Sequence, residues 1–148
     1  MAALFRREER RVMEGFPFVV PYTVGVADVN YGGHVANSAV LNIFQDARIA
    51  WLATLGPFSE LDLGGCGIIM PEAHVYFRAE MFLRDQLQVG VRCTAIKRSS
   101  FVLAYRIDRT GDLMAEGETP LVCFDYQNRK PSRMPSLFRQ ALHDFTQG

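Results

Sequence analysis

One segment of this chain is apolar around most of a helical circumference, whereas nearly all the rest alternates like strands. Residues 37–54 read NSAVLNIFQDARIAWLAT. Their apolar positions recur at helical spacing and continue around the helix at Val40, Leu41, Phe44, Ala47, Ile49, Trp51 and Leu52. A helix that is apolar nearly all round is expected to be buried. Asn37 or Ser38 can cap its first turn. The fold must therefore enclose this helix.

Alternating apolar residues predict strands on both sides of the helix. The segments that alternate are 16–28, 73–80, 87–95, 101–107 and 122–126. Pro120 suggests a bulge, an edge or a strand start before the last of them. Residues 97–100 and 109–112 read as hairpin connections, and links this short require antiparallel neighbours.

The order of these elements predicts an α+β fold in which an antiparallel sheet of about five strands wraps around a central helix. A second, amphipathic helix is expected over residues 135–146. No linker or internal repeat divides the chain, so residues 1–148 are expected to form a single domain. Residues 1–15, including the charged run Arg6–Arg11, are expected to be an N-terminal extension or short helix.

Composition excludes several classes of protein. Sixteen Lys and Arg balance sixteen Asp and Glu, which argues against a nucleic-acid partner. No stretch approaches 18 uncharged apolar residues and no signal peptide is recognisable, so no membrane span is expected. Cys66, Cys93 and Cys123 form no CxxC pair, which indicates reduced thiols in a cytoplasmic protein. No pattern of metal ligands is found in the sequence.

The least ordinary stretch is DVNYGGHVAN, residues 28–37, between the first strand and the central helix. Gly32 and Gly33 allow a tight turn with backbone N–H groups open to a ligand. The helix that follows directs its positive end to the same place, and His34 adds a titratable group there. The stretch is either an oxyanion-binding loop or simply a well-formed entry to the helix.

Asp46 lies twelve residues after His34, inside the helix that is expected to be buried. A buried carboxylate is costly unless it is paired, hydrogen-bonded or protonated. Asp46 is therefore either the partner of a distant Arg or Lys, or a carboxylate held for work as a base or nucleophile.

Together these residues resemble the signature of the hotdog-fold acyl-CoA thioesterases, closest to the 4-hydroxybenzoyl-CoA thioesterase-like branch. The pattern is roughly D-x-[DN]-x-x-G-H-V-x-N followed by an acidic residue, Ala and Arg, matched here by residues 28–37 and Asp46–Arg48. The likeness continues through Tyr76–Glu80, Ser99–Ile107 and Ala115–Asp125 and covers roughly residues 16–145.

The resemblance implies a hotdog domain that forms a homodimer or a homotetramer with active sites at the dimer interface. It implies hydrolysis of acyl thioesters of coenzyme A or of acyl carrier protein, with acyl-CoA preferred, and no metal or redox cofactor, coenzyme A being only part of the substrate. It places the thioester carbonyl near the backbone of Gly33, His34 and Val35, and makes Val35 and Asn37 substrate contacts. Asp46 takes the position of an acidic helix residue found in many relatives.

One departure changes the expected chemistry. Many catalytic relatives have Asp four residues before the His, where this chain has Asn30. Asn can hold a carbonyl or a water but cannot act as base or nucleophile. The carboxylate is then expected to be Asp46, Asp28 or, across the interface, Glu72, in that order. It either activates a water or attacks the thioester directly.

Basic residues in turns are expected to meet the phosphates of coenzyme A, chiefly Lys97, Arg98 and Lys130. Two alternatives stay open on the same fold. One is a noncatalytic protein that binds acyl thioesters, suggested by Asn30. The other is an enoyl-thioester hydratase, which the GHVAN and DAR elements disfavour.

Overall fold

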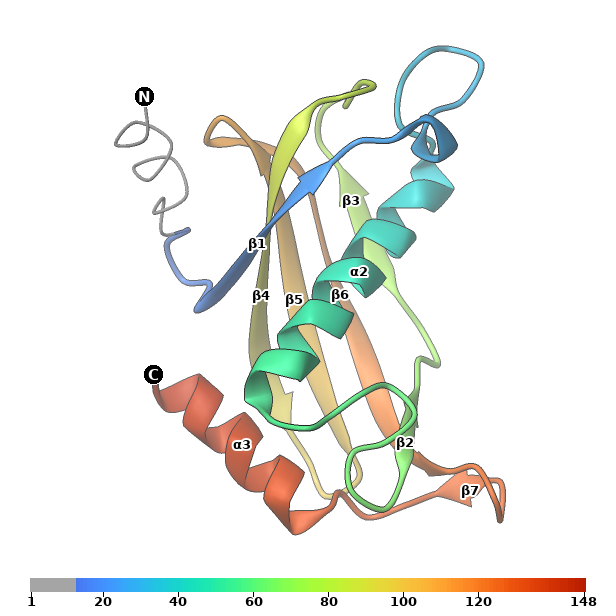
Figure 1. Cartoon of the computed structure of the whole chain (residues 1–148), viewed down its shortest axis with the longest axis vertical. Helices are drawn as coiled ribbons and strands as arrows, with labels where there is room; N and C mark the ends of the chain where they lie inside the picture. The colour runs from blue at the N-terminus through green and yellow to red at the C-terminus, as the bar shows by residue number, and fades with distance from the viewer. Residues whose placement is uncertain (1–12) are drawn as a thin grey trace.

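The computed structural model describes residues 13–148 (Figure 1). The charged run Arg6–Arg11 and most of the expected N-terminal extension therefore lie outside the described residues. One curved antiparallel sheet makes up most of the described chain, and a long helix crosses its inner face. The predicted α+β architecture, with the sheet wrapped around a central helix, is confirmed.

The sheet follows the order β1-β4-β5-β6-β2, with β3 and β7 also paired to β6. Its strands are β1 Phe18–Thr23, β2 Gly67–Ile69, β3 His74–Phe77, β4 Gln86–Ile96, β5 Ser100–Arg109, β6 Asp112–Asp125 and β7 Lys130–Pro131. Every pairing is antiparallel. The two hairpins predicted from short turns join β4 to β5 and β5 to β6.

Helix α2, Asn37–Leu55, lies in the concave face of the sheet. Its inward residues Ile43, Phe44, Ala47 and Trp51 are fully buried, and the Phe44 ring stacks on that of Tyr105 at 4.4 Å. The opposite face is open: Asn42, Gln45 and Asp46 are exposed, and Ile49 keeps 53% of its surface accessible. The expectation of burial all round is therefore wrong, because the sheet covers only one side of the helix.

Helix α3, Ser136–Gln147, closes the lower end of the core (Figure 1). Its Phe138 packs edge-on against Phe58, and its Phe145 packs against Trp51 near the end of α2. These aromatic contacts, each worth about 0.5–1.5 kcal/mol beyond area burial, fix the far end of α2. The first turn of α2 is positioned instead by the loop that precedes the helix.

The observed strands differ from the sequence prediction in several places. The first strand ends at Thr23, and a 3-10 turn, η1 Val26–Asp28, replaces its predicted continuation. The short strands β2 and β7 have no counterpart among the predicted segments. Strand β6 runs straight through Pro120.

Pro120 is tolerated because of where its nitrogen points. The Cys123 N–H donates to Ser99 on the β5 side, so strand alternation directs Pro120 to the other edge of β6. On that edge β3 pairs with Glu118 and earlier residues, and β2 pairs from Val122 onward. Pro120 therefore sits in the gap between them, where no ladder hydrogen bond is lost.

Within residues 13–148, the outer edges of β2 and β3 pair with no other strand. Large apolar side chains in β3 and just after β2 are exposed: Met70, Tyr76 and Phe77 keep 40–51% of their surface accessible. An unpaired, apolar edge is a ready template for pairing with another chain.

Candidate active site

The loop between β1 and α2 is tied to its neighbours by backbone hydrogen bonds. The Val35 N–H donates to the Met81 carbonyl at 2.7 Å, and the Ala36 N–H donates to the Asp28 carbonyl at 2.8 Å. The second bond places Asp28 directly beside the residue that precedes α2. The loop thus fixes the start of the helix against the segment between β3 and β4.

Asp28 is nearly buried, with 9% of its surface accessible. Its Oδ2 accepts hydrogen bonds from the Tyr22 hydroxyl at 2.8 Å and from the Gly25 N–H at 2.9 Å. Burial and the neighbouring Asp28 carboxylate raise the pKa of Tyr22 to about 12, with a smaller contribution from the charge of Asp46. Asp28 therefore holds a neutral tyrosine as its donor.

Asn30, Gly32 and His34 form a compact turn. The Asn30 Oδ1 accepts a hydrogen bond from the Gly32 N–H at 2.9 Å. The His34 ring lies over Gly32, where an added Cβ would come within 2.9 Å of Nε2. Gly33 has a φ of +80°, a conformation that favours glycine. Gly33 is therefore required by the backbone of this turn, whereas a side chain at position 32 would have to displace the His34 ring, which is half-buried beside it.

Of the three backbone donors expected at this turn, His34 alone keeps an N–H with no acceptor within residues 13–148. The Gly33 N–H already donates to the Asn30 carbonyl at 3.0 Å, and the Val35 N–H is used by Met81. The helix is capped by Ala36, whose side chain has no acceptor, and not by Asn37 or Ser38. Within residues 13–148 the N–H groups of Asn37 and Ser38 donate to no protein atom. The open donors thus lie at His34 and at the first turn of α2.

Asp46 is exposed on the outer face of α2, contrary to the expectation that it is buried. Nine residues separate it from Asn37, which corresponds to about 13 Å along the helix axis. Glu72 is also exposed and lies 3.7 Å from the His74 Nε2. Of the three expected carboxylates, only Asp28 lies next to the start of α2 within one copy of the chain.

The expected phosphate contacts are not brought to this end of the molecule. Lys97 and Arg98 lie in the turn between β4 and β5, and Lys130 lies in β7. Figure 1 shows both places at the end of the sheet opposite to the start of α2. A single copy of the chain does not unite these basic residues with the loop of residues 28–37.

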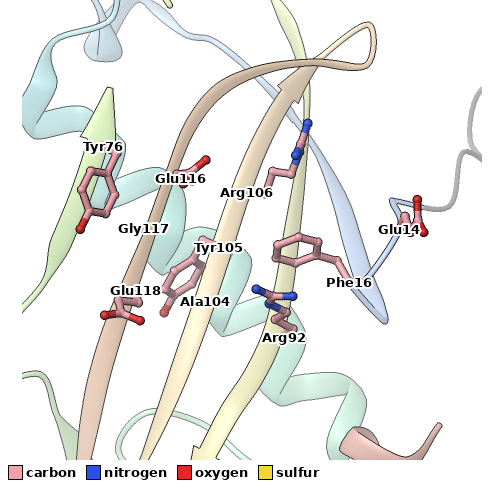
Figure 2. Close-up of a pocket in the computed structure, with 10 residues that line it drawn as sticks. All are labelled: Glu14, Phe16, Tyr76, Arg92, Ala104, Tyr105, Arg106, Glu116, Gly117 and Glu118. Carbon is pink, nitrogen blue, oxygen red and sulfur yellow. The ribbon is translucent and has the colours of Figure 1, made fainter. Parts of the chain in front are cut away.

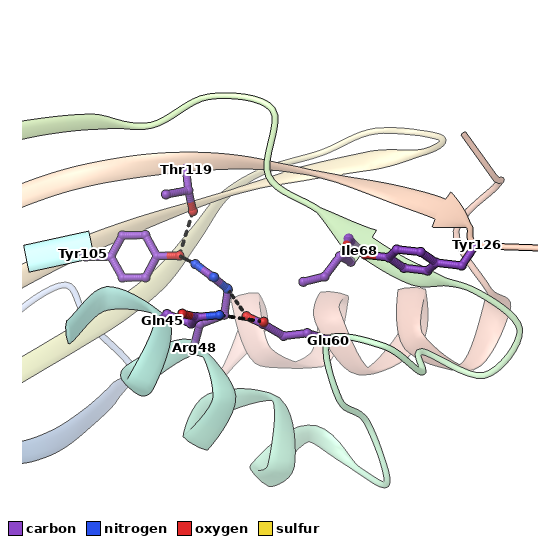
Figure 3. A network of polar contacts seen from close by, with 7 residues as sticks. All are labelled: Gln45, Arg48, Glu60, Ile68, Tyr105, Thr119 and Tyr126. Carbon is purple, nitrogen blue, oxygen red and sulfur yellow. Dashed lines mark hydrogen bonds and ion pairs between the residues drawn. The ribbon is translucent and has the colours of Figure 1, made fainter. Parts of the chain in front are cut away.

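A polar network that the sequence did not reveal crosses the interior near the middle of α2 (Figure 3). The Arg48 Nε donates to the Glu60 Oε1 at 2.6 Å, and a second guanidinium nitrogen donates to the Tyr105 hydroxyl at 3.0 Å. That hydroxyl also shares a 2.7 Å hydrogen bond with the Thr119 Oγ1, in which either oxygen can donate. Arg48 keeps only 5% of its surface accessible. Its helical spacing from Phe44 was the one available signal of burial.

Glu60 faces a cleft of about 490 Å³ between α2 and β2. Leu41 and Asn42 border this cleft from α2, and Met70 borders it from the end of β2. The Gln45 Nε2 donates to the Glu60 Oε2 at 3.3 Å. This cleft lies on the same side of the sheet as α2 and begins close to the helix start.

A second cleft, of about 470 Å³, lies on the face of the sheet that is turned away from α2 (Figure 2). Tyr105 points inward to Phe44, so its neighbours Ala104 and Arg106 point outward and border this cleft. Arg92 stacks on the Phe16 ring at 4.9 Å at one rim. The sheet separates these groups from the open donors of α2.

Neither a metal centre nor a membrane span is found within residues 13–148. No three His, Cys, Asp or Glu side chains are gathered there as a metal site would require. Neither of the helices α2 and α3 has the length and apolarity needed to cross a bilayer.

Comparisons with known proteins place this geometry among thioesterases. The Thioesterase-like superfamily matches residues 24–142. A 1,4-dihydroxy-2-naphthoyl-CoA hydrolase of Synechococcus elongatus is 26% identical over 118 residues, covering 78% of this chain and 87% of that protein. The predicted resemblance to the hotdog thioesterases is confirmed.

Solved structures agree. A thioesterase of Thermus thermophilus, determined with coenzyme A and Zn, superposes with a TM-score of 0.81 at 27% identity, covering 92% of this chain and 98% of that one. A gentisyl-coenzyme A thioesterase superposes with a TM-score of 0.77 at 25% identity, covering 84% and 99%. The predicted hotdog fold is confirmed, and the relatives support hydrolysis of acyl thioesters.

The Tyr22–Asp28 pair predicts a stability change at high pH. The ordinary tyrosine pKa of 10.0 is raised to about 12, so between these values the folded chain keeps a proton that the unfolded chain has lost. The stabilisation is present below pH 10 and is lost as the pH rises towards 12. NMR titration of the Tyr22 ring should show this pKa, and Asp28→Asn should lower it. A Tyr22 pKa that Asp28→Asn leaves unchanged would contradict the assigned cause.

The Arg48–Glu60 pair predicts unequal effects of removing each partner. Glu60→Leu leaves a nearly buried guanidinium unpaired and should cost about 3 kcal/mol of unfolding free energy. Arg48→Met leaves a carboxylate that keeps 22% of its side chain accessible to water, so the loss should be smaller, about 2 kcal/mol. Urea denaturation of both single variants and of the double variant gives the coupling free energy between the two side chains, which we expect to be about 1–3 kcal/mol. Strictly additive losses would show that the pair is not coupled.

Proposed function

Because this chain belongs to the thioesterase-like superfamily, we propose that it hydrolyses acyl thioesters of coenzyme A at the start of α2. The observation that carries this site is the uncapped first turn of the helix. Asn37 and Ser38 present N–H groups without protein partners among residues 13–148, at the positive end of a 19-residue helix. The names of the relatives support acyl-CoA as the substrate class, since two of them act on coenzyme A thioesters.

The thioester carbonyl would accept hydrogen bonds from these N–H groups. Negative charge develops on that oxygen as the tetrahedral intermediate forms, and donors fixed in advance stabilise it most. The backbone bonds from Ala36 to Asp28 and from Val35 to Met81 hold the donors in place. Asn30 and His34 flank the same turn and are proposed to contact the substrate or the attacking water.

We assign the activating carboxylate to Asp28 ahead of Glu72 and Asp46. Asp28 is nearly buried beside the start of α2, and both of its observed hydrogen bonds go to Oδ2, which leaves Oδ1 for a water. Glu72 would act from a second copy of the chain. Asp46 is exposed and lies about 13 Å along the helix axis from Asn37, so it ranks last.

A homodimer joined through the edges of β3 fits the exposed apolar side chains on that edge. Antiparallel pairing of two β3 strands about a two-fold axis turns one copy end for end. The Lys97, Arg98 and Lys130 end of one copy would then approach the α2 start of the other, where coenzyme A phosphates need basic partners. A dimer of dimers is compatible with the same pairing.

A cytoplasmic location is proposed from the cysteines. Cys66, Cys93 and Cys123 all carry free thiols. Unbridged thiols are typical of reducing compartments.

Replacing Asn37 by Pro removes the proposed donor with little disturbance of the helix. Pro is favoured at the first helical position, and Ala36, at φ −67° and ψ 144°, already has the conformation that precedes a proline. Asn37→Pro should lower kcat by about 100- to 1000-fold, as loss of an oxyanion donor does. Asn37→Ala, which keeps the N–H, is the matched control. Equal turnover of the two variants would exclude this N–H as a donor to the carbonyl.

The carboxylate assignment is tested with isosteric amides. Asp28→Asn should lower kcat for acyl-CoA hydrolysis by about 100-fold or more, the usual contribution of a general base. The kcat of Asp46→Asn should stay within a few-fold of the parent value. The kcat of His34→Ala measures the contribution of the side chain at the turn. Loss of activity in Asp46→Asn with full activity in Asp28→Asn would reverse the order. Binding of acyl-CoA without turnover in the parent would favour the noncatalytic alternative.

A further inference from the structure

We propose that the cleft between α2 and β2 receives the acyl group and that Glu60 accepts a hydrogen bond from a hydroxyl group on it. This inference rests on the proposed thioesterase function and names the class of acyl group that the site selects. Glu60 would be a specificity-determining residue. The activating carboxylate remains a separate group.

The position of the cleft suits an acyl group bound by its carbonyl at the start of α2. Leu41 and Gln45, which border the cleft, follow Asn37 by four and eight residues. They therefore lie about 6 and 12 Å further along the helix axis. An acyl group that extends from the open N–H donors along this face enters the cleft. Its volume of about 490 Å³ lies in the range of small-molecule sites.

The walls of the cleft combine apolar surface with one fixed acceptor. Leu41, Ile68, Met70 and Leu121 line it with apolar side chains. The Glu60 carboxylate is the only anionic group among the residues of 13–148 that border this cleft. In sites of this kind, a small number of polar groups on an otherwise apolar wall orients the ligand.

Glu60 is held in place from inside the protein. Its Oε1 takes the 2.6 Å bond from Arg48, and Arg48 is fixed in turn by the Tyr105 hydroxyl. Its Oε2 receives only the longer 3.3 Å contact from Gln45 (Figure 3). An ionised carboxylate can accept about four hydrogen bonds and donates none. Glu60 can therefore accept an O–H from the ligand and would repel a second carboxylate.

A purely structural role explains less of this arrangement. Arg48 needs a counter-charge, and Oε1 alone provides it. That role does not require a partly exposed carboxylate to border an apolar cleft, with Gln45 at its second oxygen. The two roles differ in a measurable way, because only the proposed one changes the choice between substrates.

The test compares acyl-CoA pairs that differ by one hydroxyl. 4-Hydroxybenzoyl-CoA is set against benzoyl-CoA, and 6-hydroxyhexanoyl-CoA against hexanoyl-CoA, so that aromatic and aliphatic sources of the hydroxyl are distinguished. The parent protein should favour the hydroxylated member of at least one pair by about 10- to 100-fold in kcat/KM, as a hydrogen bond to a charged group does. Glu60→Gln should reduce that ratio to about threefold or less.

Controls separate selectivity from folding. Glu118→Gln removes an exposed carboxylate from the opposite face of the sheet and should keep the parent ratio. Gln45→Met, at an exposed position, should lower the ratio by freeing the second Glu60 oxygen from its only orienting contact within residues 13–148. This second variant carries the test if Glu60→Gln is too unstable to assay.

The outcomes distinguish this inference from the proposed function. Equal kcat/KM within both pairs for the parent protein, with rapid hydrolysis, would overturn the role of Glu60 and leave the thioesterase function standing. Hydrolysis of none of the four substrates would count against the function instead. The Kd values of the thioether analogues 4-hydroxyphenacyl-CoA and phenacyl-CoA would then test the cleft directly, and equal values would overturn it.

Discussion

The burial of one face of α2 in the curved sheet is the contact on which the rest of the structure depends. Phe44 and Trp51 are fully enclosed, and the stack of Phe44 on Tyr105 ties the helix to the middle of the sheet. Burying side chains of this size contributes several kcal/mol. These contacts hold the centre and the far end of the helix, and the backbone bonds from Val35 to Met81 and from Ala36 to Asp28 hold its first turn. A catalytic donor on a backbone N–H needs that placement.

The same helix carries polar groups on two other faces. Arg48 points into the protein and Asp46 points to solvent, although only two residues separate them. Successive helical positions turn by about 100°, so residues two apart face in different directions. The buried guanidinium is stabilised only because Glu60 and Tyr105 reach it from distant parts of the chain. The loop of residues 56–66 is thereby joined to the centre of the helix by an ion pair as well as by apolar contacts.

Periodicity and the family motif predicted the elements that repeat regularly. The alternation of 87–95 and 101–107 indicated β4 and β5, and the helical spacing of Val40, Phe44 and Trp51 indicated α2. Alternation could not show that β1 ends at Thr23, because the 3-10 turn after it continues the same apolar spacing. Pro120 could not be placed inside β6 without knowing that β2 and β3 leave a gap beside it.

The site was predictable only in part. The motif located the loop of residues 28–37, but the partners of its N–H groups depend on the Met81 segment, which is remote in sequence. Likewise, no local pattern links Arg48 to Glu60 or to Tyr105, which is 57 residues away. Long-range pairing of polar groups is set by tertiary packing, and no periodic pattern in a single sequence reveals it.

Ala36 leaves the first turn of α2 without a side-chain cap. A Ser, Asp or Asn at that position would bond the first-turn N–H groups and stabilise the protein by about 1 kcal/mol. The same bond would place an oxygen of the protein where the carbonyl of the substrate is proposed to sit. A chain selected for stability alone would acquire such a cap with one substitution. On the proposed function, an alanine at this position is a stability–activity trade-off: the folded protein is slightly less stable, and the bound thioester takes the place of the missing cap.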